Sequence, residues 1–125
     1  MTGGTSPRRI LVVDDDVHIR EILVQRLRQR GYDAEGASDG QDAMQKLHAA
    51  RWDVLVLDLI MPRMSGTEVL RALENDPAAP PCIVISSLAE IWGRRAAASP
   101  RYAVLPKPFD FARLLVLIEQ MSGRS

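Results

Sequence analysis

Acidic, hydroxyl and basic side chains follow four separate apolar runs of this chain, each at the point where the run ends. The run at 10–13 ends in three aspartates, and the run at 54–57 ends in Asp58. The run at 82–85 ends in Ser86, and a shorter run at 104–105 leads through Pro106 to Lys107. If these runs are parallel strands, their carboxyl ends meet at one edge of a sheet, where open α/β sheets bind ligands. The three aspartates of the first run are Asp14, Asp15 and Asp16.

Carboxylates crowded beside one ammonium group suit a divalent cation and a phosphoryl group. Mg²⁺ takes a few carboxylates together with waters and phosphate oxygens, so Asp14, Asp15 and Asp58 are candidate metal ligands. A carboxylate can also act as the nucleophile toward phosphorus. Lys107 would supply a positive charge for one phosphate oxygen, and Ser86 a hydroxyl donor for another. The chemistry that this set indicates is phosphoryl transfer, which needs positioning and charge neutralisation above all.

Each of these features is ordinary when it is taken alone. Aspartates at strand ends often cap helices, Lys-Pro is a common loop dipeptide, and Ser-Ser after a strand is usually a turn. We interpret the joint pattern as functional, because chance rarely places four such groups at the ends of four different predicted strands.

Short apolar runs alternate with amphipathic segments five times, which is the pattern of βα units built on a parallel sheet. The strand at about 32–37 is the weakest prediction, because Asp33, Glu35 and Gly36 interrupt its apolar residues. The run at 54–57 is continuous and is expected at the centre of the sheet, buried on both faces. The strands are predicted at about 9–13, 32–37, 54–57, 82–85 and 104–105.

A helix is predicted after each strand. Asp16 is expected to cap the first helix and Gly31 to close it in a left-handed conformation. The later helices are expected after Asp39, around 69–73, over about 89–98 and over about 110–121. The apolar face predicted for the first helix consists of Ile19, Ile22, Leu23 and Leu27.

The length of 125 residues and the composition indicate one globular domain, expected at 8–122, with a flexible N-terminal tail at 1–7 and a short C-terminal end at 123–125. Sixteen basic and sixteen acidic residues cancel, which argues against nucleic acid or an anionic membrane as a direct partner. The single cysteine, Cys82, lies in an apolar run and is interpreted as a small buried hydrophobe. No signal peptide and no apolar run of about 20 residues is visible. We therefore expect a cytoplasmic protein.

The chain resembles the receiver domains of bacterial two-component response regulators, the CheY-like fold, over about residues 8–121. The resemblance implies an α/β fold with a five-stranded parallel sheet of order 2-1-3-4-5 and helices on both faces. It places the weak second strand at one edge and the fifth, which ends near Pro106, at the other. The residues that carry it are Val13-Asp14-Asp15, Leu57-Asp58 with Met61-Pro62 and Gly66, Ile85-Ser86, and Lys107-Pro108-Phe109.

The resemblance also implies a phosphoacceptor and its metal ligands. Asp58 would accept a phosphoryl group from a sensor histidine kinase or a phosphotransfer protein. Asp15 and Asp58 would bind Mg²⁺ directly together with the backbone carbonyl of Ile60, and Asp14 would act largely through water. The chain would transfer a phosphoryl group to itself and would not be a turnover enzyme.

The resemblance further implies a switch. Lys107 would contact the phosphate, and its bond to Pro108 would be cis. Ser86 would move toward the phosphate and relay the change to the surface of the fourth helix, fifth strand and fifth helix. That surface, near Arg94 and Arg95, would dock an effector, an output domain or a second copy of the chain, with a solvated charged face as the alternative.

Some positions depart from the family pattern. The family usually has Tyr or Phe three residues before the lysine, and this chain has Val104 there. Tyr102, on the same strand face, and Trp92 are other candidates for a reporting aromatic, although packing is the simpler role for both. Ile60 and Leu88 would flank the phosphoryl group, which suggests a long-lived aspartyl phosphate.

Three rival functions fit parts of the sequence. A phosphohydrolase of the haloacid dehalogenase type needs a second carboxylate two residues after the nucleophile, where this chain has Ile60. A pseudo-receiver, an interaction module that signals without phosphorylation, stays open because Val104 replaces the usual aromatic. A DNA-binding protein in its own right has no support from the net charge or from a helix-turn-helix segment.

Overall fold

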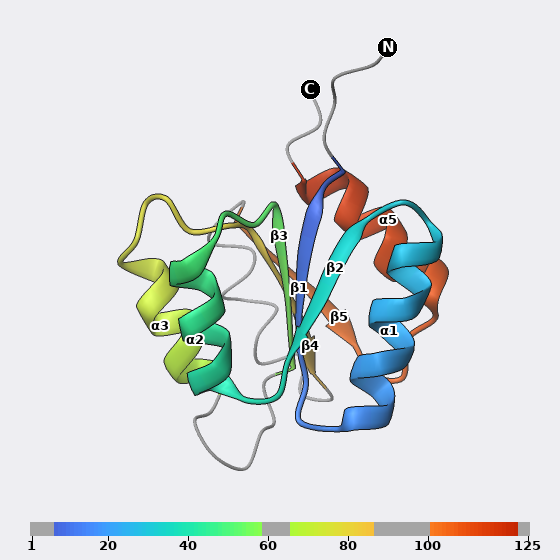
Figure 1. Ribbon diagram of the computed structural model, residues 1–125, viewed down its shortest axis with the longest axis horizontal. Coiled ribbons are helices and arrows are strands. Elements are labelled where there is room, and N and C mark those ends of the chain that lie inside the picture. The colour runs from blue at the N-terminus through green and yellow to red at the C-terminus, as the bar shows by residue number, and fades with distance from the viewer. Residues whose placement is uncertain (1–6, 59–65, 87–100, 123–125) are drawn as a thin grey trace.

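The computed structural model describes residues 7–58, 66–86 and 101–122, and these form a sheet with helices on both faces (Figure 1). The five parallel strands are ordered β2-β1-β3-β4-β5, so the predicted fold class and strand order are confirmed. Pro106 ends an edge strand, where its missing N–H costs no sheet hydrogen bond. The strands are β1 (Arg9–Val13), β2 (Asp33–Ala37), β3 (Val54–Asp58), β4 (Cys82–Ser86) and β5 (Tyr102–Pro106).

The helices divide between the two faces of the sheet (Figure 1). On one face lie α1 (Val17–Gln29) and α5 (Phe111–Met121), and on the other lie α2 (Gly40–Ala49) and α3 (Gly66–Glu74). The helix predicted over 89–98 falls outside the described residues.

Aspartate caps begin three of these helices. Asp16, Asp39 and Asp110 each accept hydrogen bonds from backbone N–H groups in the first turn of α1, α2 and α5. Gly31, just after α1, has a φ of 92°, a left-handed conformation that favours glycine. The caps predicted at Asp16 and Gly31 are therefore confirmed.

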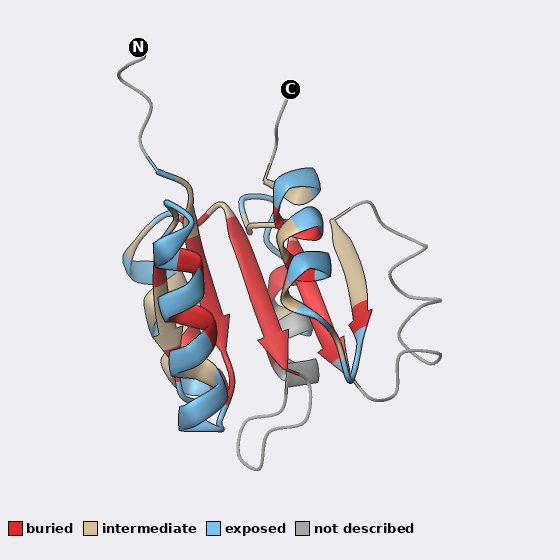
Figure 2. Ribbon diagram, turned by 90° about the vertical axis from the view of Figure 1, so that its right-hand side faces the viewer, coloured by how far each residue is buried: buried red, intermediate tan, exposed pale blue. Residues whose placement is uncertain are grey.

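The central strands of the sheet are buried on both faces (Figure 2). In β1, Ile10 and Val12 pack into the apolar cluster on the α1 and α5 side, whereas Leu11 and Val13 pack into the cluster on the α2 and α3 side. Every residue of β3 is buried. Burial from both sides explains why β1 and β3 consist of continuous apolar residues and do not alternate with polar ones.

The buried face of α1 differs from the predicted one. Leu23 and Leu27 are buried as expected, together with Val24, but Ile19 is 43% exposed and Ile22 is 53% exposed. The reason is geometric: the side chains that face the sheet are spaced at i, i+1 and i+4, and Ile22 then points away from it. Several apolar residues in this helix allow more than one face, and only contact with the sheet selects one.

Candidate functional site

Three carboxylates meet at the carboxyl end of the sheet, which is its lower end in Figure 1. Asp14 and Asp15 follow β1, and Asp58 is the last residue of the neighbouring strand β3. Carboxylate oxygens of the three residues lie within 4.8 Å of one another. Asp14 and Asp58 are only 5% and 4% exposed, whereas Asp15 is exposed. A cluster of oxygen donors with one side open to solvent suits a hard divalent cation.

Lys107 brings a positive charge to this cluster from beyond the edge strand β5. Its Nζ donates a hydrogen bond to Asp58 Oδ2 at 3.0 Å, although β4 lies between their two strands in the sheet. The peptide bond from Lys107 to Pro108 is cis, as predicted. The ammonium group offsets part of the cost of burying the Asp58 carboxylate.

Asp14 is held in an environment that disfavours its charge. Burial raises the pKa of Asp14, and the nearby carboxylates of Asp58 and Asp15 raise it further. Against this, Asp14 Oδ1 accepts a hydrogen bond from the Asp16 N–H at 2.9 Å, and the charge of Lys107 also favours the ionised form. The balance is a raised pKa, which is what an acidic site shows before a cation relieves its repulsion.

We expect Asp14→Asn to stabilise the protein by about 1 kcal/mol at neutral pH in the presence of a chelator. The amide oxygen can still accept the hydrogen bond from Asp16, while the buried charge is removed. Because the pKa of Asp14 is higher in the folded than in the unfolded state, the folded wild type gains stability as pH falls through that raised pKa. The advantage of the variant should therefore shrink toward acid pH. Urea unfolding of both proteins across this range measures it.

Mg²⁺ provides the control for this prediction. If the cation binds among the three carboxylates, it should stabilise the wild type more than Asp14→Asn and reduce or reverse the difference. A variant that is less stable than the wild type in chelator at neutral pH would contradict the prediction.

The other predicted site residues are only partly described. Ser86 ends β4, the strand between β3 and β5, and pairs in register with Pro106, so its backbone lies at the same end of the sheet as the carboxylates. Nothing is described of the Ser86 side chain. Ile60 and Leu88 fall outside the described residues, and so does Trp92.

Val104, at the position where receiver domains usually have an aromatic residue, is a partly buried residue of β5. It packs with Tyr102 against the apolar cluster on the α2 and α3 side, so the two side chains share a strand face as predicted. Cys82 is a buried free thiol, also as predicted. Arg94 and Arg95 fall outside the described residues.

An apolar hollow of about 410 Å³ adjoins the carboxylates, a feature that no pattern in the sequence indicated. Ile19, expected in the core, instead forms part of the wall of this hollow. The sequence signal that could have indicated this is its position three residues after Asp16, close to the acidic segment, and not its place in the helical repeat. The hollow is lined by Asp14, Ile19, Leu23, Ile85, Lys107, Pro108 and Phe109.

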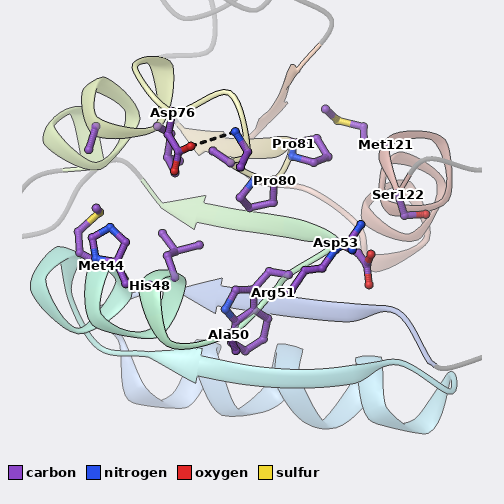
Figure 3. Close-up of a pocket in the computed structure, with 16 residues that line it drawn as sticks. Met44, His48, Ala50, Arg51, Asp53, Asp76, Pro80, Pro81, Met121 and Ser122 are labelled. Atoms are coloured by element: carbon purple, nitrogen blue, oxygen red, sulfur yellow. Dashed lines mark hydrogen bonds between the residues drawn. The ribbon is translucent and has the colours of Figure 1, made fainter.

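A larger pocket of about 980 Å³ lies at the opposite end of the sheet (Figure 3). Its acidic residues hold the local backbone: Asp53 Oδ2 accepts a hydrogen bond from the Arg9 N–H at 2.7 Å, and Asp76 Oδ1 accepts one from the Ala78 N–H at 2.9 Å. Met44 and His48 of α2 and the Pro80-Pro81 segment form other parts of its wall. We assign this pocket no part in the chemistry of the carboxylates.

Comparison with known proteins identifies the family. The model of the response regulator receiver domain matches residues 10–119, and the chain belongs to that family, the receiver domains of two-component systems. The response regulator MprA of Mycolicibacterium vanbaalenii is 38% identical over 122 residues, which cover 95% of this chain and 52% of that protein. MprA of Mycobacterium tuberculosis is 39% identical over 120 residues, covering 94% and 51%. The chain thus spans about half the length of these relatives.

Solved structures give the same result for the fold. The chemotaxis response regulator CheY4 of Vibrio cholerae matches with a TM-score of 0.80 and 29% identity, covering 92% of this chain and 98% of that one. The response regulator TrrA of Thermotoga maritima, solved in complex with Mg(2+)-BeF, matches with a TM-score of 0.78 and 30% identity, covering 91% and 98%. Within the described ranges, the helices are too short or too polar to cross a membrane.

Proposed function

We propose that this chain accepts a phosphoryl group on Asp58 from a histidine kinase or a phosphotransfer protein and uses the resulting acyl phosphate as a signal. The observation that carries this proposal is the buried Asp58 carboxylate at the end of the central strand β3. Asp14 and Asp15 offer oxygens within 4.8 Å, and Lys107 Nζ lies 3.0 Å from Asp58 Oδ2. A nucleophile between an oxygen-rich cation site and an ammonium group suits self-directed phosphoryl transfer.

The reaction would use the side chains of the site in distinct roles. An oxygen of Asp58 would attack phosphorus, and the phosphorus–nitrogen bond of a phosphohistidine donor would break as the new phosphorus–oxygen bond forms. Lys107 would exchange its contact with Asp58 for one with a phosphoryl oxygen and stabilise the charge that develops there. Ser86 is proposed to donate its hydroxyl to another phosphoryl oxygen and to act as the switch.

Asp14, Asp15 and Asp58 would hold Mg²⁺, with the backbone carbonyl of Ile60 as a further ligand. The residues fit this ion because their donors are all oxygens, lie together and are open to solvent at Asp15. Bound there, the cation would neutralise the carboxylates and orient the phosphoryl oxygens. The Mg(2+)-BeF complex of the related TrrA supports this assignment.

The proposed function also implies a surface for downstream partners and a cellular location. The surface of the predicted fourth helix, β5 and α5 would pass the change to an effector, an output domain or a second copy of the chain. We also propose a cytoplasmic location, which the single buried thiol of Cys82 suits. The chain would complete one transfer to itself and would not turn over a substrate.

The test is the intact mass of the protein after incubation with acetyl phosphate and MgCl₂. We expect one added phosphoryl group in the wild type, and none in Asp58→Asn or in the presence of a chelator. Asp53→Asn is the matched control, because Asp53 directly precedes β3, at the end of that strand opposite to Asp58, and its amide can keep the hydrogen bond from Arg9. This control should be phosphorylated like the wild type.

Circular dichroism before the reaction shows whether each variant is folded. An adduct of equal yield in Asp58→Asn would place the acceptor elsewhere. A folded wild type that takes no phosphoryl group from acetyl phosphate or from phosphohistidine donors would overturn the proposal in favour of a pseudo-receiver.

A further inference from the structure

Arg20 of α1 lies on the face of the helix that carries its buried apolar residues. Leu23, Val24 and Leu27 are the buried residues of α1, and Arg20 precedes them by three, four and seven positions. Residues at these spacings share one helical face, so Arg20 continues the buried stripe toward the N-terminus of the helix. A long cationic side chain at such a position calls for a specific partner.

Gly36 leaves the space that this side chain occupies. A Cβ added at Gly36 would lie 2.8 Å from both Cδ and Cγ of Arg20, which is closer than real Cβ atoms approach. Gly36 has no positive φ, so the close approach, and not the backbone conformation, is what requires glycine here. Glycine weakens a strand interior, and a close approach is a recognised reason to find one there.

Beyond Gly36, the guanidinium of Arg20 reaches the acidic segment. Its Nη1 donates a hydrogen bond to the backbone carbonyl of Asp14 at 2.8 Å. The Asp14 N–H donates to the carbonyl of Ala37 at 3.2 Å. The carbonyl of Asp14, which accepts from Arg20, belongs to the peptide unit that joins Asp14 to Asp15, and a peptide unit is planar. A bond that fixes the carbonyl oxygen of Asp14 therefore also fixes the nitrogen and Cα of Asp15.

We propose that Arg20 is a positioning residue that sets the Asp14–Asp15 peptide, and with it the two carboxylates, for cation binding. This inference rests on the proposed function for the identity of the cation as Mg²⁺. Outer groups that orient metal ligands typically contribute 10–100-fold to metal affinity. Gly36 takes part by leaving open the path that the Arg20 side chain follows across β2.

Arg28 offers a matched control on the same helix. Its Nε donates a hydrogen bond to the backbone carbonyl of Ala34 at 2.9 Å, so it also ties α1 to β2. Ala34 lies at the second position of β2, paired with Ile10 and away from the carboxylates. Removing Arg28 therefore removes an arginine–carbonyl contact of the same type without touching the acidic segment.

The experiment measures the Mg²⁺ dissociation constant of each variant by isothermal titration calorimetry, and the acetyl phosphate reaction as a function of MgCl₂ concentration. We expect Arg20→Ala to weaken Mg²⁺ binding by about tenfold or more. The half-saturating Mg²⁺ concentration of the reaction should rise by the same factor, with a smaller change in the rate at saturating Mg²⁺. Arg28→Ala should bind Mg²⁺ like the wild type, and Arg20→Lys should recover part of the lost affinity.

Combining substitutions of Arg20 and Gly36 distinguishes a loss of positioning from a general loss of structure. Gly36→Ala keeps the guanidinium but blocks its path, so it should weaken Mg²⁺ binding toward the level of Arg20→Ala. In the Arg20→Ala background the same glycine substitution should change nothing further. Should Arg20→Ala fail to fold by circular dichroism, Arg20→Lys and Gly36→Ala carry the same comparison.

Different outcomes test the role of Arg20 and the proposed phosphorylation of Asp58. If Arg20→Ala and Arg28→Ala bind Mg²⁺ equally well, or if the effects of Arg20→Ala and Gly36→Ala simply add, the inference is wrong. A wild type that binds Mg²⁺ but takes no phosphoryl group would overturn the proposed function, while the calorimetric comparison still tests Arg20.

Discussion

Replacing Lys107 with methionine should lower the rate of phosphorylation by acetyl phosphate by about a hundredfold or more, the usual loss when one preorganised charge donor is removed. The expectation follows from the 3.0 Å contact of Lys107 Nζ with Asp58 Oδ2, which places the ammonium group at the proposed acceptor. Methionine keeps a long side chain but has no charge. Intact mass over a time course at saturating Mg²⁺ measures the rate.

The same substitution should change how stability depends on Mg²⁺. Without the ammonium group, the apo protein should lose about 1–3 kcal/mol of stability, because a cation is removed from beside the buried Asp58. Mg²⁺ should then stabilise the variant more than the wild type, because the ammonium group no longer offsets the repulsion among the three carboxylates. Thermal unfolding with and without MgCl₂ tests this.

Lys46→Met is the control for Lys107→Met, because Lys46 is the other lysine of the chain and it contacts Gly36 and Asp42, not Asp58. Its phosphorylation rate should stay within about twofold of the wild type. If Lys107→Met reacts as fast as Lys46→Met, then Lys107 does not contact the phosphoryl group in the way proposed.

The largest effect on stability is expected at the centre of the sheet. Leu57→Ala should cost about 3–4 kcal/mol, because Leu57 is fully buried in β3 and its loss leaves a cavity in a layer packed from both sides. This is a large fraction of the 5–15 kcal/mol by which a domain is typically stable. Urea unfolding followed by circular dichroism gives the difference in free energy of unfolding.

Ile22→Ala is the contrasting substitution, because it truncates an aliphatic side chain of the same size that is exposed and not buried. Ile22 is 53% exposed on α1, and alanine favours a helix, so the change should stay within about 0.5 kcal/mol. A loss of unfolding free energy above about 2 kcal/mol for Ile22→Ala, or below about 1 kcal/mol for Leu57→Ala, would contradict the burial described for these two residues.

Local chemistry in the sequence was sufficient to predict the strands, the caps and most of the candidate site. The strands were visible because a parallel strand covered on both faces needs an unbroken apolar run, as at 54–57. Asp16 and Gly31 were visible because helix ends have particular hydrogen-bonding and conformational needs. The gathering of Asp14, Asp15, Asp58 and Lys107 followed from one rule, that parallel strands end at the same edge.

Resemblance to a family, and not local pattern, supplied the strand order. An apolar run does not specify its neighbours, since the pairing of β1 with both β2 and β3 depends on crossovers that the run itself does not encode. The α/β class followed from the alternation of elements alone. The order 2-1-3-4-5 needed the matching motifs as well.

By itself, the sequence determined which side chains are available and which strand ends carry them, because these depend on neighbours along the chain. Only the tertiary structure decided which face of α1 is buried, that Ile19 lines a hollow beside the carboxylates, and that Arg20 passes over Gly36 to the Asp14 carbonyl. The packing of α1 on the sheet and the approach of Arg20 to Gly36 join separate elements of the chain, and the helix could satisfy its own periodicity in more than one rotation. Packing against the sheet selects one rotation, since it must bury apolar area and leave each buried polar group with a partner.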